Sequence, residues 1–157
     1  MKRYIFLIIG LMTSLTAFSQ SYPPDAFVTT WRIISAGETL TIPTNDEDGT
    51  LTYDYTVDWG DGTSDANRTG DASHEYTTAG TYTVQITGTF PRFYLNQNAA
   101  IKDKLLTVAQ WGNIQWASME GAFFGASNMT LTATDVPDLS NVTNMYSMFW
   151  GATTFNQ

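Results

Sequence analysis

The sequence predicts a mainly β protein, in which a small antiparallel sandwich is followed by a segment of short repeats. Two observations carry this prediction. From residue 22 to about residue 96, short runs of alternating apolar and polar residues are separated by turn-forming clusters, which is the pattern of half-buried strands joined by tight turns. In the last third of the 157 residues, one stretch repeats another at a constant offset of 26 residues, which is typical of a repeat architecture.

The clearest strand lies at residues 51–59, where five apolar side chains alternate with Thr and Asp. Residues 81–87 show the same alternation, with positions 82, 84 and 86 expected to point inward. Shorter strands are expected at residues 27–33 and 40–42. Turn clusters separate these runs, at residues 45–49, 60–62 and 79–80. About 75 residues of this kind are enough for a small sandwich.

Three motifs within this region resemble, in order and spacing, the signature of the PKD domain, an immunoglobulin-like β-sandwich of extracellular proteins. They are Val57-Asp58-Trp59-Gly60-Asp61-Gly62, His74-Glu75-Tyr76 and Ala79-Gly80-Thr81-Tyr82-Thr83-Val84. The resemblance implies that His74 and Tyr76 hold a loop against the sheet and take no part in chemistry. It implies a structural role for the whole set, which is Trp59, Gly60, Asp61, Gly62, His74, Tyr76, Gly80 and Tyr82.

The internal repeat aligns residues 114–129 with residues 140–155, within the period of leucine-rich repeats. Residues 138–157 are similar to the repeat unit of BspA-like leucine-rich-repeat proteins, a resemblance that implies a bacterial cell-surface protein with an adhesive role. The sequence therefore predicts a PKD-like immunoglobulin-type sandwich at 22–98, followed by the start of a leucine-rich-repeat solenoid at 104–157. Two coils are fewer than a solenoid needs, so we expect the chain to be the front of a longer protein. The alternative is that the coils pack back on the sandwich.

The first 19 residues have the pattern of a secretory signal peptide, with two cations, an apolar run and a small-residue cleavage site. We therefore expect a protein that is secreted or located at the cell surface, without a transmembrane span in the mature chain. With no cysteine in the sequence, acylation of an N-terminal cysteine is excluded as the means of attachment.

Composition excludes several classes of function. Seven Lys and Arg against fifteen Asp and Glu leave a net charge of −8, which argues against nucleic acid as a partner because such binding depends on clustered cations. The absence of cysteine removes disulfides, thiolate nucleophiles and Cys-based metal sites. A catalytic zinc site takes three side-chain ligands drawn mainly from His, Cys and carboxylate, so one histidine and no cysteine argue against such a site. We expect no enzyme activity and no cofactor.

The remaining candidates for a site are acidic turns and aromatic side chains. Calcium prefers clustered carboxylates, so its candidate ligands are Asp46, Asp48, Asp58 and Asp61, although acidic turns are usually only solvated. Trp111 and Trp150 each precede a glycine and are expected to be exposed for partner binding. Taken with what the two family resemblances imply, these observations predict a bacterial surface protein that binds an extracellular protein or polysaccharide. The alternative is an accessory module of a secreted carbohydrate-active enzyme or protease.

Overall fold

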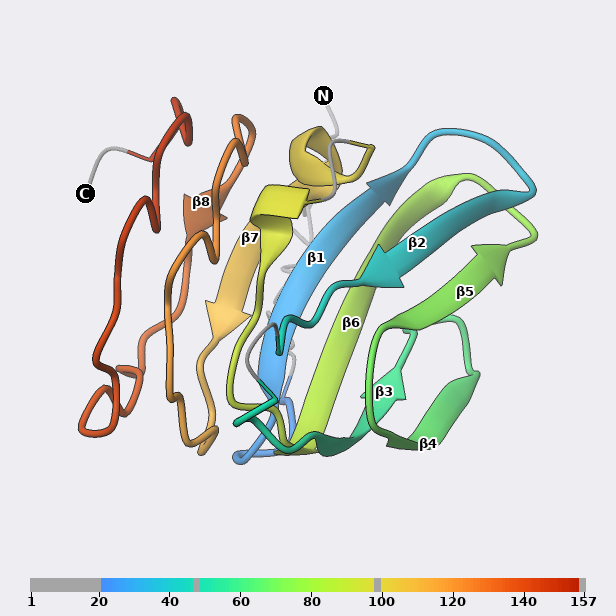
Figure 1. The fold of residues 1–157 in the computed structure, drawn as a ribbon. Helices are drawn as coiled ribbons and strands as arrows, with labels where there is room; N and C mark the ends of the chain where they lie inside the picture. Colours follow the sequence, from blue (N-terminus) through green and yellow to red (C-terminus); the bar gives the residue numbers. More distant parts are fainter. Residues whose placement is uncertain (1–20, 47–48, 98–99, 156–157) are drawn as a thin grey trace, which may run out of the picture.

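A computed structural model describes residues 21–46, 49–97 and 100–155, and it is mainly β (Figure 1). The predicted signal peptide lies outside these residues. Two short 3-10 helices, η1 (Leu95–Gln97) and η2 (Lys102–Lys104), precede the repeat segment. Within the described ranges there is no α-helix, and no helix is long and apolar enough to cross a membrane. The strands are β1 (Phe27–Ile33), β2 (Glu38–Ile42), β3 (Asp54–Asp58), β4 (Ser64–Arg68), β5 (Ala72–Tyr76), β6 (Gly80–Thr89), β7 (Leu105–Gln110) and β8 (Thr130–Leu131).

The strands form two sheets. One has six strands in the order β4-β3-β6-β1-β7-β8, and the other consists of β2 and β5. In the large sheet, β1 pairs antiparallel with β6 from Phe27↔Ile86 to Ile33↔Gly80, and antiparallel with β7 on its other side. In Figure 1, β2 passes in front of β6, and Leu40 and Ile42 of β2 belong to the same core as Val84 of β6. The predicted mainly β sandwich is therefore confirmed.

The alternating pattern correctly located β3 and β6. Tyr55 and Val57 are buried in β3, and Val84 and Ile86 are buried in β6. The predicted strand at 51–59 is shorter in the structure, because Tyr53 leaves the strand ladder and its hydroxyl donates to the carbonyl of Asn45.

The small sheet contains a strand that the sequence analysis did not predict. His74 and Tyr76 lie in strand β5, paired with Leu40 and Glu38 of β2. This strand has only five residues, and only its two ends, Ala72 and Tyr76, are buried, so its pattern is too short to be distinguished from a loop in the sequence.

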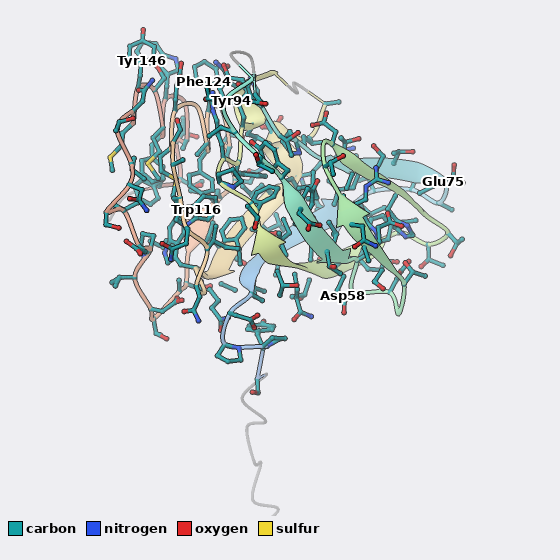
Figure 2. The ribbon with its side chains drawn as sticks, turned by 60° about the horizontal axis from the view of Figure 1, so that its bottom comes forward. Asp58, Glu75, Tyr94, Trp116, Phe124 and Tyr146 are labelled. Carbon is teal, nitrogen blue, oxygen red and sulfur yellow. The ribbon has the colours of Figure 1, made fainter. Side chains whose placement is uncertain are left out.

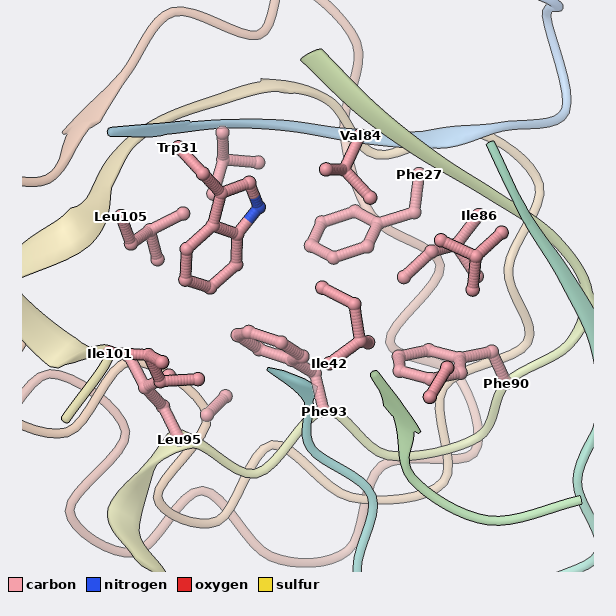
Figure 3. Close-up of a cluster of buried hydrophobic side chains, with 14 of the residues drawn as sticks. Phe27, Trp31, Ile42, Val84, Ile86, Phe90, Phe93, Leu95, Ile101 and Leu105 are labelled. Carbon is pink, nitrogen blue, oxygen red and sulfur yellow. The ribbon is translucent and has the colours of Figure 1, made fainter. Parts of the chain in front are cut away.

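One hydrophobic core extends from the sandwich into the repeat segment. Figure 3 shows part of it, with Phe27 and Trp31 of β1 and Val84 of β6 on one side and Ile42 of β2 on the other. The same cluster includes aromatic rings from the repeat segment. Phe27 contacts the ring of Trp116 at a centroid distance of 5.1 Å. The sandwich and the repeat segment thus share one sheet and one core.

The repeat segment forms two successive coils, which we call coil 1 (residues 105–129) and coil 2 (residues 130–155). Strand β8 begins coil 2 and lies parallel to β7, which begins coil 1. A second parallel bridge joins Gln115 to Asp138. Coil 2 is therefore stacked in parallel on coil 1, on the side away from β1 (Figure 1).

The two coils have the same local backbone conformation at the predicted offset of 26 residues. Gly121 has φ 58° and Ser147 has φ 55°, while Gly125 and Gly151 both have φ 74°. Left-handed residues are uncommon outside glycine, so their recurrence at equivalent positions confirms the internal repeat as a repeat of structure.

Candidate functional site

The three motifs of the sandwich meet at the turn between β3 and β4. His74 Nε2 lies 2.8 Å from Oδ2 of Asp61, and its ring stacks on Trp59 at a centroid distance of 5.1 Å. The hydroxyl of Tyr76 donates to the carbonyl of Trp59 at 2.8 Å. These contacts attach the turn to the small sheet.

Asp61 is held by hydrogen bonds on both oxygens. Its Oδ1 accepts from the backbone N–H and the hydroxyl of Thr63, and its Oδ2 contacts His74. Partial desolvation opposes ionisation, but the hydrogen bonds from Thr63 and His74 outweigh it and lower the pKa of Asp61. Gly60, with φ 77°, lies so close to Thr83 that an added Cβ would be 2.4 Å from the carbonyl oxygen. The arrangement makes internal contacts of the kind that a structural role requires.

A family model described as PKD domain matches residues 21–89. These residues form a PKD domain. Comparisons with curated proteins and with solved structures found no match. The PKD domain ends with β6, so β7, β8 and both coils lie beyond the matched region. The leucine-rich-repeat assignment of residues 104–157 stays a prediction.

The calcium candidates of the PKD domain are used in local turns. Oδ1 of Asp58 accepts from the backbone N–H of Gly60 at 2.9 Å, and Oδ1 of Asp46 accepts from that of Leu51 at 2.8 Å. Asp48 lies outside the described residues. In the part of the chain that the structure describes, no three His, Cys, Asp or Glu side chains gather in a group that could hold a metal ion.

The two candidate tryptophans differ in their surroundings. Trp111 is only 4% exposed, and its ring packs against Phe27 and Phe123 at 5.8 and 5.9 Å. The expectation that Trp111 is exposed is therefore wrong, because coil 1 packs back on β1 and covers it. Trp150, on coil 2, is 69% exposed, so the predicted exposure of Trp150 is confirmed while its role in partner binding stays a prediction.

Coil 2 carries a group of exposed apolar side chains, which we call the outer-coil face. Its members are Val136, Leu139, Met145, Tyr146 and Trp150. Figure 2 shows Tyr146 of this face and Glu75 of β5 at opposite ends of the molecule. Exposure follows from the stacking order: Met119 of coil 1 is fully buried, whereas its repeat equivalent Met145 is 47% exposed. The outer-coil face is thus a separate surface from the PKD motifs.

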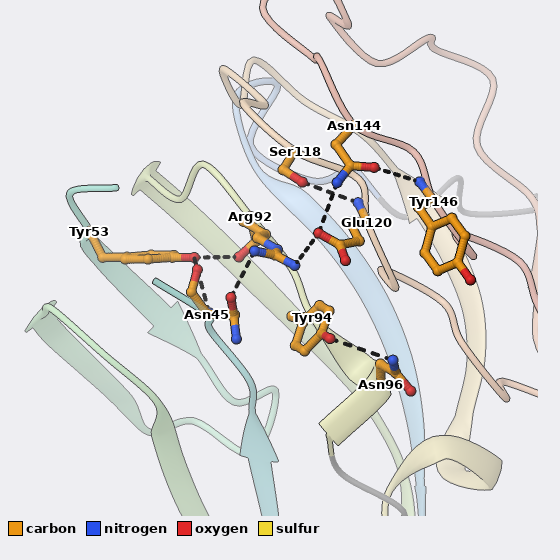
Figure 4. Close-up of polar contacts among 9 residues, drawn as sticks. All are labelled: Asn45, Tyr53, Arg92, Tyr94, Asn96, Ser118, Glu120, Asn144 and Tyr146. Atoms are coloured by element: carbon orange, nitrogen blue, oxygen red, sulfur yellow. Dashed lines mark hydrogen bonds and ion pairs between the residues drawn. The ribbon is translucent and has the colours of Figure 1, made fainter. Parts of the chain in front are cut away.

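A polar cavity of about 230 Å³ lies between the PKD domain and the coils. Arg92 donates from Nη1 to Asn45 and from Nη2 to Glu120, at 2.7 and 3.0 Å (Figure 4). Oε2 of Glu120 also accepts from Nδ2 of Asn144 at 2.9 Å. The network joins the PKD domain to both coils. The charges of Arg92 and Glu120 are paired with each other in this network.

The sequence did not reveal this network. Arg92 follows the last strand of the PKD domain, Glu120 lies in coil 1 and Asn144 in coil 2. No local spacing connects three residues that meet only because the coils fold back on the sandwich. The one related signal was the repeat itself, since Glu120 and Tyr146 occupy equivalent positions at which the two copies differ.

Proposed function

We propose that the protein is a secreted or surface-located binding protein without catalytic activity, whose partner contacts the outer-coil face. The PKD domain supports the extracellular part of the proposal, because such domains are typical of extracellular binding or accessory modules. The predicted signal peptide supports it independently.

The observation that carries the proposal is the concentration of exposed apolar side chains on coil 2. Six large hydrophobic side chains are exposed among the described residues, and five of them form the outer-coil face. Single exposed apolar residues are normal, but their concentration on one coil indicates an interaction surface. Tyr146 is 74% exposed and Trp150 69%, and these two residue types are enriched among side chains that dominate binding energy.

The partner that we propose is an extracellular protein or a polysaccharide. Aromatic rings offer a large rigid contact area at low entropic cost, which suits either class. The stacked coils extend the large sheet beyond β1 and β7, and stacked repeats provide extended binding surfaces. In this proposal the PKD domain orients the coils, because both share one core.

The test is a glycan and matrix-protein array probed with the purified protein and two variants. Tyr146→Ala with Trp150→Ala removes the two aromatic side chains of the outer-coil face. Ile34→Ala is the matched control, because Ile34 is also 69% exposed but lies directly after β1. We expect the double variant to lose at least about tenfold in affinity and the control to bind normally. No binding to any class, or equal binding by the double variant, contradicts the proposal.

A second candidate is an accessory module of a secreted carbohydrate-active enzyme or protease, which the PKD domain equally favours. The same array separates the two. Binding to one insoluble polysaccharide that persists in the double variant favours the accessory module, because its contacts then lie away from the outer-coil face.

A further inference from the structure

The polar cavity between the PKD domain and the coils has walls from several segments that are far apart in the sequence. They are the loop before β3 (Thr50 and Leu51), the segment after β6 (Arg92), coil 1 (Ser118 and Glu120) and coil 2 (Thr143). Thr50 and Thr143 are exposed, so solvent reaches the cavity from outside. Small-molecule sites occur preferentially where two domains meet, and this cavity has such a position.

The lining residues have hydrogen-bonding capacity that the protein itself does not use. The hydroxyl oxygen of Ser118 accepts from the backbone N–H of Glu120 at 3.2 Å, which leaves the hydroxyl proton to donate. The hydroxyl of Thr143 has no hydrogen-bond partner among the described residues. Oε2 of Glu120 accepts from Arg92 and Asn144, whereas within the described ranges its Oε1 has no donor. The cavity therefore offers both donors and an acceptor.

The charges at the cavity favour a neutral ligand. Arg92 is the one cation of the lining, and both of its terminal nitrogens already donate, to Asn45 and Glu120 at 2.7 and 3.0 Å. An anionic ligand would meet the carboxylate of Glu120 without a further cation to balance it. A ligand with hydroxyl groups suits the lining, because each hydroxyl both donates and accepts a hydrogen bond.

The size and lining of the cavity correspond to one sugar ring. Its volume of about 230 Å³ lies below the roughly 300–1,000 Å³ of pockets that bury drug-sized ligands. Leu51 and Ala117 add apolar surface beside the polar groups. A sugar ring carries the same mixture, with hydroxyl groups around its edge and C–H groups on its faces. The open side of the cavity lets the rest of a polysaccharide chain continue outside it.

The cavity is connected to the outer-coil face through Asn144. Nδ2 of Asn144 donates to Glu120 at 2.9 Å, and its Oδ1 accepts from the backbone N–H of Tyr146 at 2.8 Å (Figure 4). We propose that the cavity is a subsite for one neutral sugar residue of a polysaccharide that also contacts the exposed ring of Tyr146. This inference rests on the proposed function and, of its two partner classes, selects the polysaccharide.

The test is a titration of the isotopically labelled protein, followed by nuclear magnetic resonance. The probes are neutral oligosaccharides of glucose, galactose, mannose and N-acetylglucosamine, with oligogalacturonate as the anionic comparison. We expect at least one neutral oligosaccharide to shift the amide signals of Ser118, Glu120 and Asn144. Oligogalacturonate should leave these signals unchanged.

Two variants change the cavity itself. Ala117→Leu adds three carbons at its wall and should weaken binding of the neutral oligosaccharide at least about tenfold. Thr143→Val removes one hydroxyl at nearly constant shape and should weaken binding about three- to tenfold, the effect of one lost hydrogen bond. Thr69→Val is the matched control, because Thr69 is also exposed and follows β4, at the opposite edge of the large sheet from β8.

Thermal melting of each variant checks that it is folded. If Ala117→Leu does not fold, Thr143→Val decides, because the Thr143 hydroxyl makes no hydrogen bond within the part of the chain that the structure describes. Three results overturn the sugar subsite: no shift with any neutral oligosaccharide, equal affinity of Thr143→Val and Thr69→Val, or equal shifts with oligogalacturonate.

Failure of the subsite is distinguishable from failure of the proposed function. If a partner from the array needs Tyr146 and Trp150 but binds Thr143→Val and Ala117→Leu normally, the proposed function stands and the subsite does not. If a neutral oligosaccharide shifts Ser118, Glu120 and Asn144 and binds the double variant equally well, the subsite stands and the outer-coil face is not the contact surface.

Discussion

Replacing Trp116 with alanine should destabilise the PKD domain, although Trp116 lies in coil 1. Its side chain is 1% exposed and contacts Phe27, Phe90 and Trp111 at centroid distances of 5.1, 6.2 and 6.3 Å. Phe27 belongs to β1 and Phe90 directly follows β6, so the ring fills space within the sandwich core. Truncating a buried Trp or Phe to Ala typically costs about 3–5 kcal/mol. We expect a loss of that size in the free energy of unfolding.

The assay combines denaturant unfolding with amide hydrogen exchange. If the core is shared, the variant unfolds in a single transition at lower denaturant, and the amides of β1 and β6 lose protection by the same free energy as those of β7. Trp116→Phe is the matched control. Trp116 Nε1 is buried and has no hydrogen-bond partner among the described residues. Phenylalanine lacks this unpaired donor, and the gain in stability from its removal offsets part of the loss caused by the smaller ring. The expected change in the free energy of unfolding is therefore within about 1 kcal/mol.

The reasoning is refuted if Trp116→Ala exposes the amides of the coils while β1 and β6 keep their protection. That result would mean that the sandwich and the coils unfold independently and that the aromatic contacts between them contribute little.

Three further predictions concern the PKD motifs. Gly62→Ala should lower the free energy of unfolding by the backbone strain alone, about 1–3 kcal/mol. Gly60→Ala should lower it further, because of these two positions only Gly60 would bring its Cβ against a carbonyl oxygen. The denaturant midpoints of the two variants measure the difference. Tyr76→Phe leaves the buried carbonyl of Trp59 without its donor and should cost about 1–3 kcal/mol, read by thermal melting. The pKa of Asp61 is lower in the folded protein than its ordinary value of 3.8, so ionised Asp61 stabilises the fold above that value, and this stabilisation is lost as the pH falls through the folded pKa. Asp61→Asn should therefore weaken the dependence of the free energy of unfolding on pH, measured by denaturant unfolding from pH 5 to pH 2.

The strands that the sequence predicted best are those with one solvent-exposed face and one buried face. Residues 54–58 and 80–89 lie at the interior of the large sheet, and their alternation reflects a sandwich core on one side only. Strand β4 escaped prediction because it is an edge strand without a fully buried residue. Strand β7 escaped because its register with β1 shifts twice, so its burial does not alternate.

The candidate site was only partly predictable, for a related reason. Trp111 and Trp150 both precede glycine in the sequence, but Trp111 packs against Phe27 of β1, whereas Trp150 lies on coil 2, over which no further coil is stacked among the described residues. Exposure in stacked coils depends on which coil a residue occupies, and a repeat pattern by itself does not contain that information. The network of Arg92, Glu120 and Asn144 likewise arises from tertiary packing of distant segments.

The most direct test of the account is a footprint of the protein bound to its partner. Hydrogen–deuterium exchange should be measured on the free protein and on its complex with the best ligand from the array. The account predicts that protection increases within residues 136–150, where the outer-coil face lies. Protection confined to the PKD turn around Asp61, or to β2 and β5, would contradict it.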